Sequence, residues 1–411
     1  MKLPIFLILL AAILFFCRKV EAQIDTTLLR HISKDTVAHA LNMDAVINRS
    51  RMAISSLPIS IGGYMEANWE HLGSAGVSDG NEFQFRRISL FFSSSITERI
   101  KFLSEIEFED GAQEISVEFA ALDIEFDPLL NLRGGMIVNP IGAFNQNHDG
   151  PKWEFVDRPI AATQMLPDTW SNAGLGLYGK KYVDNWMFGY EFYISGGFDN
   201  SIIENTENKT FLPAATENPE RFEESSNGEP LFTGKIAAGN DVLGEVGFSW
   251  MGGIYNTYQS EGLTIDDKRR VDVFDVDYNT TLPNIDTRII GEWAWIFVDV
   301  PATYSQNFGD EQRGGFVDIV QPVLREKMFG WPNAVVNVAC RFEYVDWNVG
   351  TFKETGGNIA DDLWSVMPAI SFRPVAQTVL RLNYRYQKQR DILGNPAVTT
   401  SGLIFGISTY F

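Results

Sequence analysis

From Pro58 to the end of the chain, apolar and polar residues alternate with a period of two, in blocks of about 9 to 14 residues. Successive side chains of a β-strand point to opposite faces, so this pattern predicts strands with one apolar and one polar face. No stretch after the first residues approaches the roughly 18 apolar residues of a membrane helix. The sixteen predicted strands are 58–70, 83–95, 98–109, 113–126, 130–138, 172–181, 184–196, 231–239, 242–257, 268–279, 284–299, 313–325, 333–347, 361–373, 376–389 and 399–411.

The connections between these strands are sorted by length. Every second connection is long except 110–112, and the alternate ones are turn-sized except 326–332. Long loops on one side and tight turns on the other are typical of bacterial outer-membrane barrels, whereas a soluble sandwich or propeller has no reason to sort them. The predicted fold is therefore all-β, a transmembrane antiparallel β-barrel of about 16 strands in contact with outer-membrane lipid.

The charged positions indicate which strand face is wet. Arg341 and Glu343 alternate with Phe342, and Arg381 and Arg385 lie opposite their apolar neighbours. An arginine on the lipid face near the bilayer midplane costs roughly 2–4 kcal/mol, so the charged faces are predicted to line the lumen.

Three local features refine the prediction. The apolar parity of strand 113–126 changes near Ala120-Ala121, which predicts a bulge. Pro322 makes its strand irregular. The last strand ends in Tyr410-Phe411, and its exposed edge would favour aggregation unless it closes the barrel against strand 58–70.

A long interruption at 139–171 separates two of the strands. It is rich in proline, asparagine and aspartate, and it carries the aromatic residues Trp153 and Trp170. Long loops with structure of their own are usually functional, so this third external loop is predicted to fold into the pore as a constriction. The wall residues expected to face it are Arg133, Arg341, Glu343, Arg381 and Arg385. The full set of candidate pore-lining residues is Arg87, Lys101, Arg133, His148, Asp149, Lys152, Arg158, Arg288, Glu292, Arg341, Glu343, Arg381 and Arg385.

The predicted lumen faces carry nearly balanced positive and negative charge. Opposite charges across a narrow pore would favour small hydrated polar solutes and set an ion preference. The alternative is that these charges pair within the wall and only keep it hydrated.

The first 22 residues resemble a secretory signal peptide, with Lys2, an apolar run and Val20-Glu21-Ala22 as cleavage site. Lipidation at Cys17 and an uncleaved anchor helix are the alternatives. Residues 23–57 lack alternation and are interpreted as a periplasmic extension, followed by the barrel at 58–411. Cleavage removes three of 33 basic and one of 53 acidic residues, which leaves a net charge of −22 and argues against nucleic acid as a partner.

Motifs for catalysis or for a bound cofactor are weak. His148-Asp149 could belong to a hydrolase at the barrel rim, but no G-x-S-x-G accompanies it. No His and Cys residues have metal-ligand spacing. We therefore predict no enzymatic activity, no cofactor and no metal centre. Acidic pairs could still hold Ca²⁺ in the loops, with solvated charge as the alternative; they are Asp266-Asp267, Asp275/Asp277 and Asp361-Asp362.

Several short motifs together resemble one family, the phosphate-selective porins (O and P). The motifs are Arg86 to Phe92 followed by Thr97 to Ile100, Leu132 to Gly135 with Asn139 to Gly142, the loop run of His148-Asp149, Arg158-Pro159, Pro167 to Trp170 and Gly174 to Gly179, Arg341 to Asp346, and Ser408 to Phe411. The resemblance covers most of 58–411 and implies a passive porin, a homotrimer in a Gram-negative outer membrane. Phosphate selectivity in that family depends on rows of arginine and lysine, which the mixed charges of this chain do not reproduce.

The expected function is a passive diffusion channel for small polar or ionic solutes, with phosphate or other anions possible through the resemblance. The alternative is a non-conducting barrel that serves as a scaffold, an adhesin or a subunit of a surface complex. In that case the acidic loop 197–230 and the extension 23–57 would be the partner sites.

Overall fold

The computed structural model of the protein describes residues 59–222, 225, 227–240 and 242–411. All of them belong to one compact unit of the chain. The interpretations of 1–22 as a signal peptide and of 23–57 as an extension lie outside the described residues. No helix among these residues is both long and apolar enough to cross a membrane.

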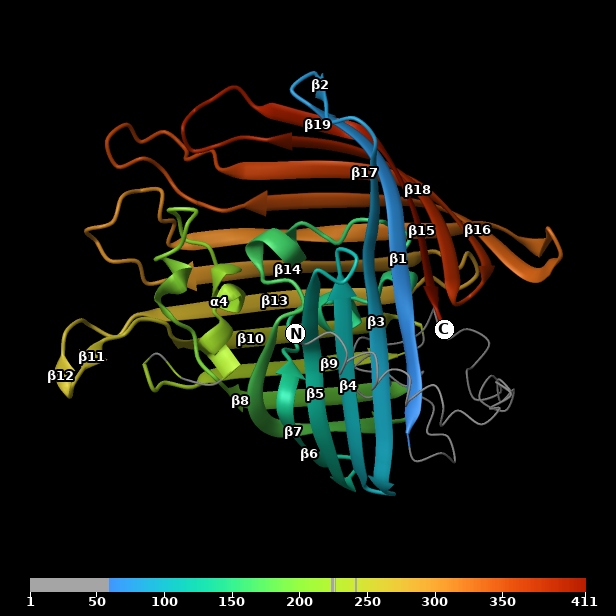
Figure 1. Cartoon of the computed structure of the whole chain (residues 1–411), viewed down its shortest axis with the longest axis horizontal. Coiled ribbons are helices and arrows are strands. Elements are labelled where there is room, and N and C mark those ends of the chain that lie inside the picture. Colours follow the sequence, from blue (N-terminus) through green and yellow to red (C-terminus); the bar gives the residue numbers. More distant parts are fainter. Residues whose placement is uncertain (1–58, 223–224, 226, 241) are drawn as a thin grey trace, which may run out of the picture. The chain divides into compact units, whose positions relative to one another are not determined.

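The described residues form a closed antiparallel barrel of sixteen long strands (Figure 1). All sixteen predicted strands are present, and their ends differ from the prediction by at most four residues. The long strands are β1 (Ser60–Ser74), β3 (Glu82–Thr97), β4 (Ile100–Glu109), β5 (Glu114–Asp127), β6 (Leu130–Val138), β7 (Ser171–Val183), β8 (Trp186–Ser195), β9 (Leu231–Asn240), β10 (Gly244–Ile254), β13 (Arg270–Thr281), β14 (Arg288–Val298), β15 (Glu311–Met328), β16 (Trp331–Asp346), β17 (Asp362–Val375), β18 (Thr378–Gln389) and β19 (Val398–Tyr410). The sequence pattern did not reveal three two-residue strands in the external loops, β2 (Val77–Ser78), β11 (Gln259–Ser260) and β12 (Leu263–Thr264).

The barrel closes between its first and last strands. β1 and β19 are antiparallel neighbours over eleven residue pairs, from Tyr64↔Tyr410 to Ser74↔Thr400. Beyond this ladder, Gly63 N donates to Phe411 O at 3.2 Å and Phe411 N donates to Gly63 O at 3.0 Å. The predicted closure against the first strand is confirmed, and it leaves neither strand with an open edge.

Two local predictions need correction. The connection at 326–332 is not long, because β15 and β16 continue to a two-residue turn at Phe329 and Gly330 with φ of 49° and 95°. Positive φ at both central positions is the geometry of the tight hairpin turn that suits twisted strands. The predicted bulge lies at Glu118, two residues before Ala120, since the register with β4 shifts there. The irregularity at Pro322 is confirmed.

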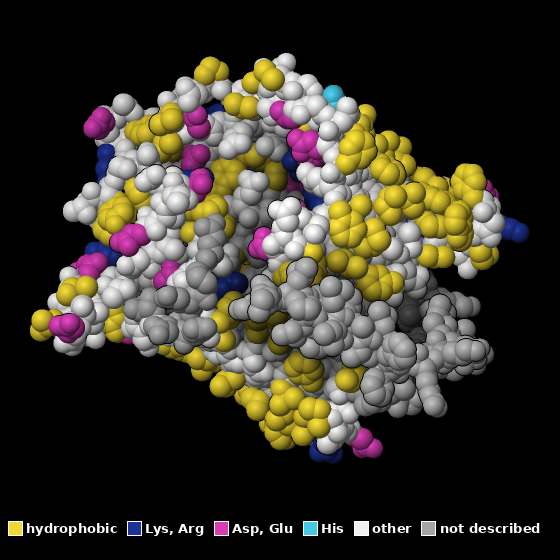
Figure 2. Space-filling model, viewed as in Figure 1, with side chains coloured by type: hydrophobic (Ala, Val, Ile, Leu, Met, Phe, Trp, Pro, Cys, Tyr) yellow, Lys and Arg dark blue, Asp and Glu magenta, His cyan; other side chains and the backbone are white. Residues whose placement is uncertain are grey.

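The outer surface of the strands is apolar, as the alternation predicts. Figure 2 shows apolar side chains covering the strands at the right and lower edge of the view, while charged side chains gather towards the long loops. On β16, Val338 and Phe342 are 46% and 48% exposed, whereas Arg341 and Glu343 point inward and are 0% and 4% exposed. The charged faces therefore point inward.

The interior differs from the predicted hydrated lumen, because part of it is an apolar core. On β13, Val271 and Val273 share the inward face with Asp275 and Asp277, and both valines are fully buried. They pack against apolar residues of two loops, at 139–170 and 196–230. The members of this core are Ile141, Ile160, Ala161, Met165, Leu166, Trp170, Phe198, Ile202, Ile203, Leu212, Ala215, Leu231, Met251, Tyr255, Val271, Val273, Ala294, Ile296, Val298, Val345, Trp347 and Leu363.

The position of the second loop also differs from the prediction. Residues 197–230 were expected to be an acidic external loop, yet Ile202 and Leu212 are fully buried in the apolar core. Ile202 lies in the short helical turn η4 (Asn200–Ile202), and the same loop also contains α4 (Ala214–Glu217) and η5 (Pro219–Phe222). Apolar residues at a few inward positions are enough to draw such a segment inside, since burial stabilises by about 25 cal/mol per Å² of apolar surface.

Candidate functional site

The segment 139–170 folds into the barrel as a structured loop, referred to below as the inner loop. It contains three short helical turns, η1 (Asn145–Asn147), η2 (Gly150–Lys152) and η3 (Ala161–Met165). Hydrogen bonds of Asn145 connect the first and last residues of this loop. Asn145 Nδ2 donates to Asn139 O at 2.8 Å and to Trp170 O at 3.0 Å, and Trp170 N donates back to Asn145 Oδ1 at 2.7 Å.

Arginines of the wall bind carbonyl groups of the inner loop. Arg381 Nη1 donates to the carbonyl oxygens of Gly150 at 3.0 Å, of Trp153 at 3.1 Å and of Phe155 at 2.6 Å. Its other terminal nitrogen contacts Glu66 Oε1 on β1 at 2.8 Å. A single buried guanidinium therefore satisfies three loop carbonyls and one carboxylate, which its fixed fork of donors makes possible.

Carboxylates of the wall bind amide groups of the same loop. Glu292 Oε2 accepts from the amides of Ala143 at 2.7 Å and Phe144 at 3.1 Å. Glu343 Oε1 accepts from Ile160 N at 2.9 Å. Because the loop has little regular structure, its backbone groups need such partners when they are buried. These wall charges hold the loop in place.

Arg341 links the wall, the loop backbone and the aromatic residues beneath it. Its guanidinium binds Asp318 through two hydrogen bonds of 2.7 Å and donates to Asp157 O at 2.7 Å. It also lies over the ring of Phe155, 4.4 Å from the centroid. Bidentate pairing and stacking together favour arginine over lysine at this position.

One flank of the inner loop stays partly accessible to water. Asp157 binds Arg86 at 2.6 Å and Arg385 at 2.7 Å, and the three side chains are 11%, 21% and 17% exposed. Arg158 pairs with Asp168 at 2.6 Å, with exposed fractions of 12% and 35%. We call these five residues the charged flank.

Acidification is expected to loosen this flank. Burial by itself raises the pKa of Asp157, but the guanidinium groups of Arg385 and Arg86 outweigh it and lower the pKa from 3.8 to about 2. That difference corresponds to roughly 2 kcal/mol in favour of the seated loop. The contribution is complete above pH 4 and disappears as the pH falls from about 4 to about 2. The protection factors of the amides in the inner loop, which compare their exchange with the intrinsic rate at each pH, should fall in that window. In Asp157→Asn these protection factors should already be lower at pH 6 and should not fall further as the pH decreases.

The predicted pore residues fall into two groups. The first group contacts the inner loop and consists of Arg288, Glu292, Arg341, Glu343, Arg381 and Arg385. Arg87 pairs with three wall carboxylates, and Lys101 pairs with Glu125. Arg133 pairs with Asp123 at 2.7 Å and, with Gln146 of the loop, lines a cavity of about 30 Å³.

The predicted pore residues on the inner loop itself also lie in different environments. Arg158 lies on the charged flank. Lys152 pairs with Asp149 at 3.0 Å, and His148 is 1% exposed with Nε2 3.6 Å from Glu105 Oε2. A histidine buried in this way is not open to an external substrate, as the hydrolase hypothesis requires.

Arg86 lies on the charged flank but is missing from the pore residues predicted from the sequence. Its neighbour Arg87 points inward, so a regular strand would direct Arg86 outward. The pairing of β1 with β3 shifts between Glu66↔Arg87 and Asn68↔Gln84, which places both arginines inside. The sequence signal is the change of apolar parity between Phe85 and Ile88.

Comparisons with known proteins support the architecture. No family model matches the chain. An uncharacterized protein of Aquifex aeolicus (strain VF5) is 38% identical over 146 residues, which span 34% of this chain and only 32% of that protein.

Among solved structures, the anion-selective porin from Comamonas acidovorans has a TM-score of 0.52 at 11% identity and covers 86% of this chain and 99% of its own. OmpF of Salmonella typhi, in complex with daunomycin, has a TM-score of 0.53 at 12% identity over 86% and 98%. A loop-deletion mutant of OmpT, an outer-membrane protein of Vibrio cholerae, has 0.52 at 10% identity over 86% and 100%. The chain therefore has the fold of outer-membrane porin barrels.

Proposed function

We propose that this barrel is a porin-like channel of the outer membrane through which small polar or ionic solutes diffuse passively, without a reaction or a cofactor. The observation that carries the proposal is the inner loop, which wall charges fasten across the interior while its charged flank remains partly exposed to water. A loop held in this way narrows a barrel that would otherwise be wide, since sixteen strands leave an aqueous channel unless something fills it.

The charges along the exposed side of the loop are mixed. Three arginines of the charged flank, Arg86, Arg158 and Arg385, face Asp157 and Asp168. Further half-buried carboxylates on the inward faces of the adjacent wall are Glu70, Glu109 and Glu118. Charged side chains at a constriction set ion preference, so we expect weak cation selectivity. The resemblance to phosphate-selective porins leaves phosphate or another anion as the alternative solute, and a homotrimer as the proposed assembly.

Reversal potentials in planar bilayers test this proposal. With a KCl gradient, the protein should conduct in discrete steps and prefer cations by a small factor. Replacement of a flank carboxylate, Asp168→Asn, should move the reversal potential towards the anion side, whereas Asp391→Asn in an external loop should leave it unchanged. Strong anion selectivity of the unmodified protein would contradict the proposed cation preference.

The apolar core inside the barrel supports a second candidate, a non-conducting scaffold. Two loops, at 139–170 and 196–230, contribute to that core, and each removes part of the interior from water. If the protein inserts into bilayers without conductance steps and retains a partner through purification, the scaffold function replaces the channel.

A further inference from the structure

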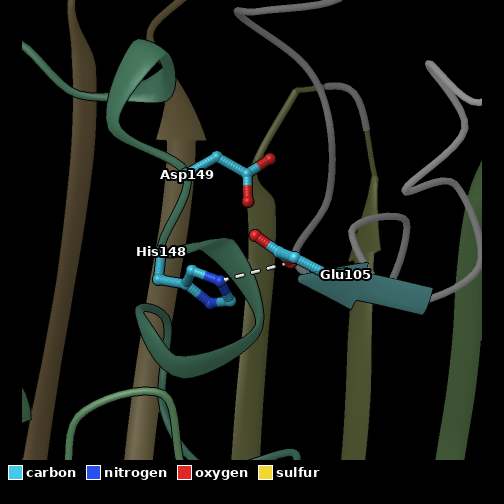
Figure 3. Close-up of side chains that lie close together, drawn as sticks. All are labelled: Glu105, His148 and Asp149. Carbon is cyan, nitrogen blue, oxygen red and sulfur yellow. Dashed lines mark ion pairs between the residues drawn. The ribbon is translucent and has the colours of Figure 1, made fainter. Parts of the chain in front are cut away.

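The fold brings three side chains of different origin together on the buried side of the inner loop. Glu105 comes from β4, while His148 and Asp149 lie between η1 and η2, and Figure 3 shows the three side chains facing one another. One ligand atom of each lies within 4.8 Å of the others. The three residues are 0%, 1% and 4% exposed.

The hydrogen bond of His148 fixes which ring nitrogen faces Glu105. Its Nδ1 lies 2.8 Å from Asn145 O, and a carbonyl oxygen can only accept, so Nδ1 carries a proton. In the neutral ring Nε2 then carries the lone pair, and it lies 3.6 Å from Glu105 Oε2. That separation is long for a hydrogen bond. It is close to the ~3.4 Å between two ligand atoms bound at about 2.1 Å to one tetrahedral ion.

The surroundings resemble the outer shell of a metal centre. Metal-binding histidines donate their second N–H to a carbonyl or carboxylate, and metal-binding carboxylates accept hydrogen bonds of their own. Asn145 O supplies the first contact, and Tyr410 Oη, which donates to Asp149 Oδ2 at 2.8 Å, supplies the second. Lys152 also contacts Asp149 at 3.0 Å, but its side chain is 30% exposed and can turn towards water when a cation enters.

We propose that Glu105, His148 and Asp149 bind one divalent transition-metal ion of the Zn²⁺ type. Two carboxylates balance the charge of the ion, and the imidazole favours a transition metal over Ca²⁺ or Mg²⁺, which prefer oxygen ligands. The side chain of the third ligand must move by about an ångström before all three ligand atoms can lie near 2.1 Å from one ion. The ion would connect the inner loop to β4, which is the neighbour of the strand β3 that carries Arg87.

Metal binding can be measured without any channel activity. The refolded protein, stripped with a chelator, is titrated with Zn²⁺ in a calorimeter and with Co²⁺ in a spectrophotometer. We expect one ion per chain and the visible absorption of tetrahedral Co²⁺ with a nitrogen ligand. His148→Gln and Glu105→Gln should each weaken Zn²⁺ binding by at least about tenfold, since even second-shell changes cost 10–100-fold.

The matched control is His71→Gln, which removes an exposed histidine of β1 and should bind as the unmodified protein does. Asp149→Asn provides a third ligand variant if one of the others fails to fold. Binding that is absent, that is unchanged in the ligand variants, or that is as tight for Ca²⁺ as for Zn²⁺ would overturn the proposal. Because no conductance enters this test, its result is independent of whether the barrel is a channel.

Discussion

Deletion of residues 144–166, with a short glycine-serine bridge across the gap, is expected to raise the single-channel conductance several-fold. The deleted residues include η1, η2 and η3, which lie inside the barrel, whereas the ladder of sixteen strands does not depend on them. Their removal also exposes the inward guanidinium groups of Arg341 and Arg381 to water, which solvates charges that now serve the loop backbone. The measurement is single-channel recording in planar bilayers at fixed salt.

A deletion outside the barrel controls for nonspecific effects. The hairpin of β11 and β12 spans Gln259–Thr264 and is exposed throughout. Its removal shortens an external loop without touching the interior and should leave conductance as it is. If removal of 144–166 also leaves conductance unchanged, the inner loop does not restrict the path of ions.

Arg381→Met is expected to release the inner loop. The variant loses the donor for three loop carbonyls, and among the described residues it leaves Glu66 with Arg87 as its one cationic partner. Breaking a buried ion pair by removal of one partner costs about 3–5 kcal/mol. Since the strand ladder remains intact, the lost free energy destabilises the attachment of the inner loop to the barrel wall. Amide exchange should become faster across residues 150–156, and channel records should show added flicker.

Two further variants separate the charge effect from the packing effect. The double variant Glu66→Gln/Arg381→Met also removes the carboxylate that lost its contact with Arg381. Because the two sites interact, part of the lost stability should be regained relative to Arg381→Met alone. Lys101→Met removes a lysine whose pair with Glu125 is 27% and 36% exposed. Pairs of that kind contribute about 0–1 kcal/mol, so exchange in the loop should not change. Equal exchange rates in Arg381→Met and Lys101→Met would show that Arg381 does not hold the loop.

Much of the barrel was predictable because alternation is a local property of the strand. Phe342 must point to the opposite face from Arg341 and Glu343. Because a charge in lipid is costly, the two charged residues point inward and Phe342 points to the lipid. The same argument placed Arg381 and Arg385 inside. The aromatic terminus at Tyr410-Phe411 needed a partner edge, and β1 supplies it. The prediction omitted Arg86, where the pairing of β1 with β3 inserts an extra residue, because a bulge depends on the neighbouring strand.

The contacts inside the barrel were beyond the reach of any local pattern. Arg381 and Phe155 lie 226 residues apart, and Glu343 and Ile160 lie 183 apart. Such pairs form only after the strands close, when each inward side chain meets the part of the loop that lies opposite. The burial of Ile202 and Leu212, the charged flank and the approach of Glu105 to His148 have the same origin. The alternation of side chains along a strand therefore determines the barrel wall of this protein. The contacts inside the barrel follow only from its closure, because closure brings together the buried polar groups that must form hydrogen bonds with one another.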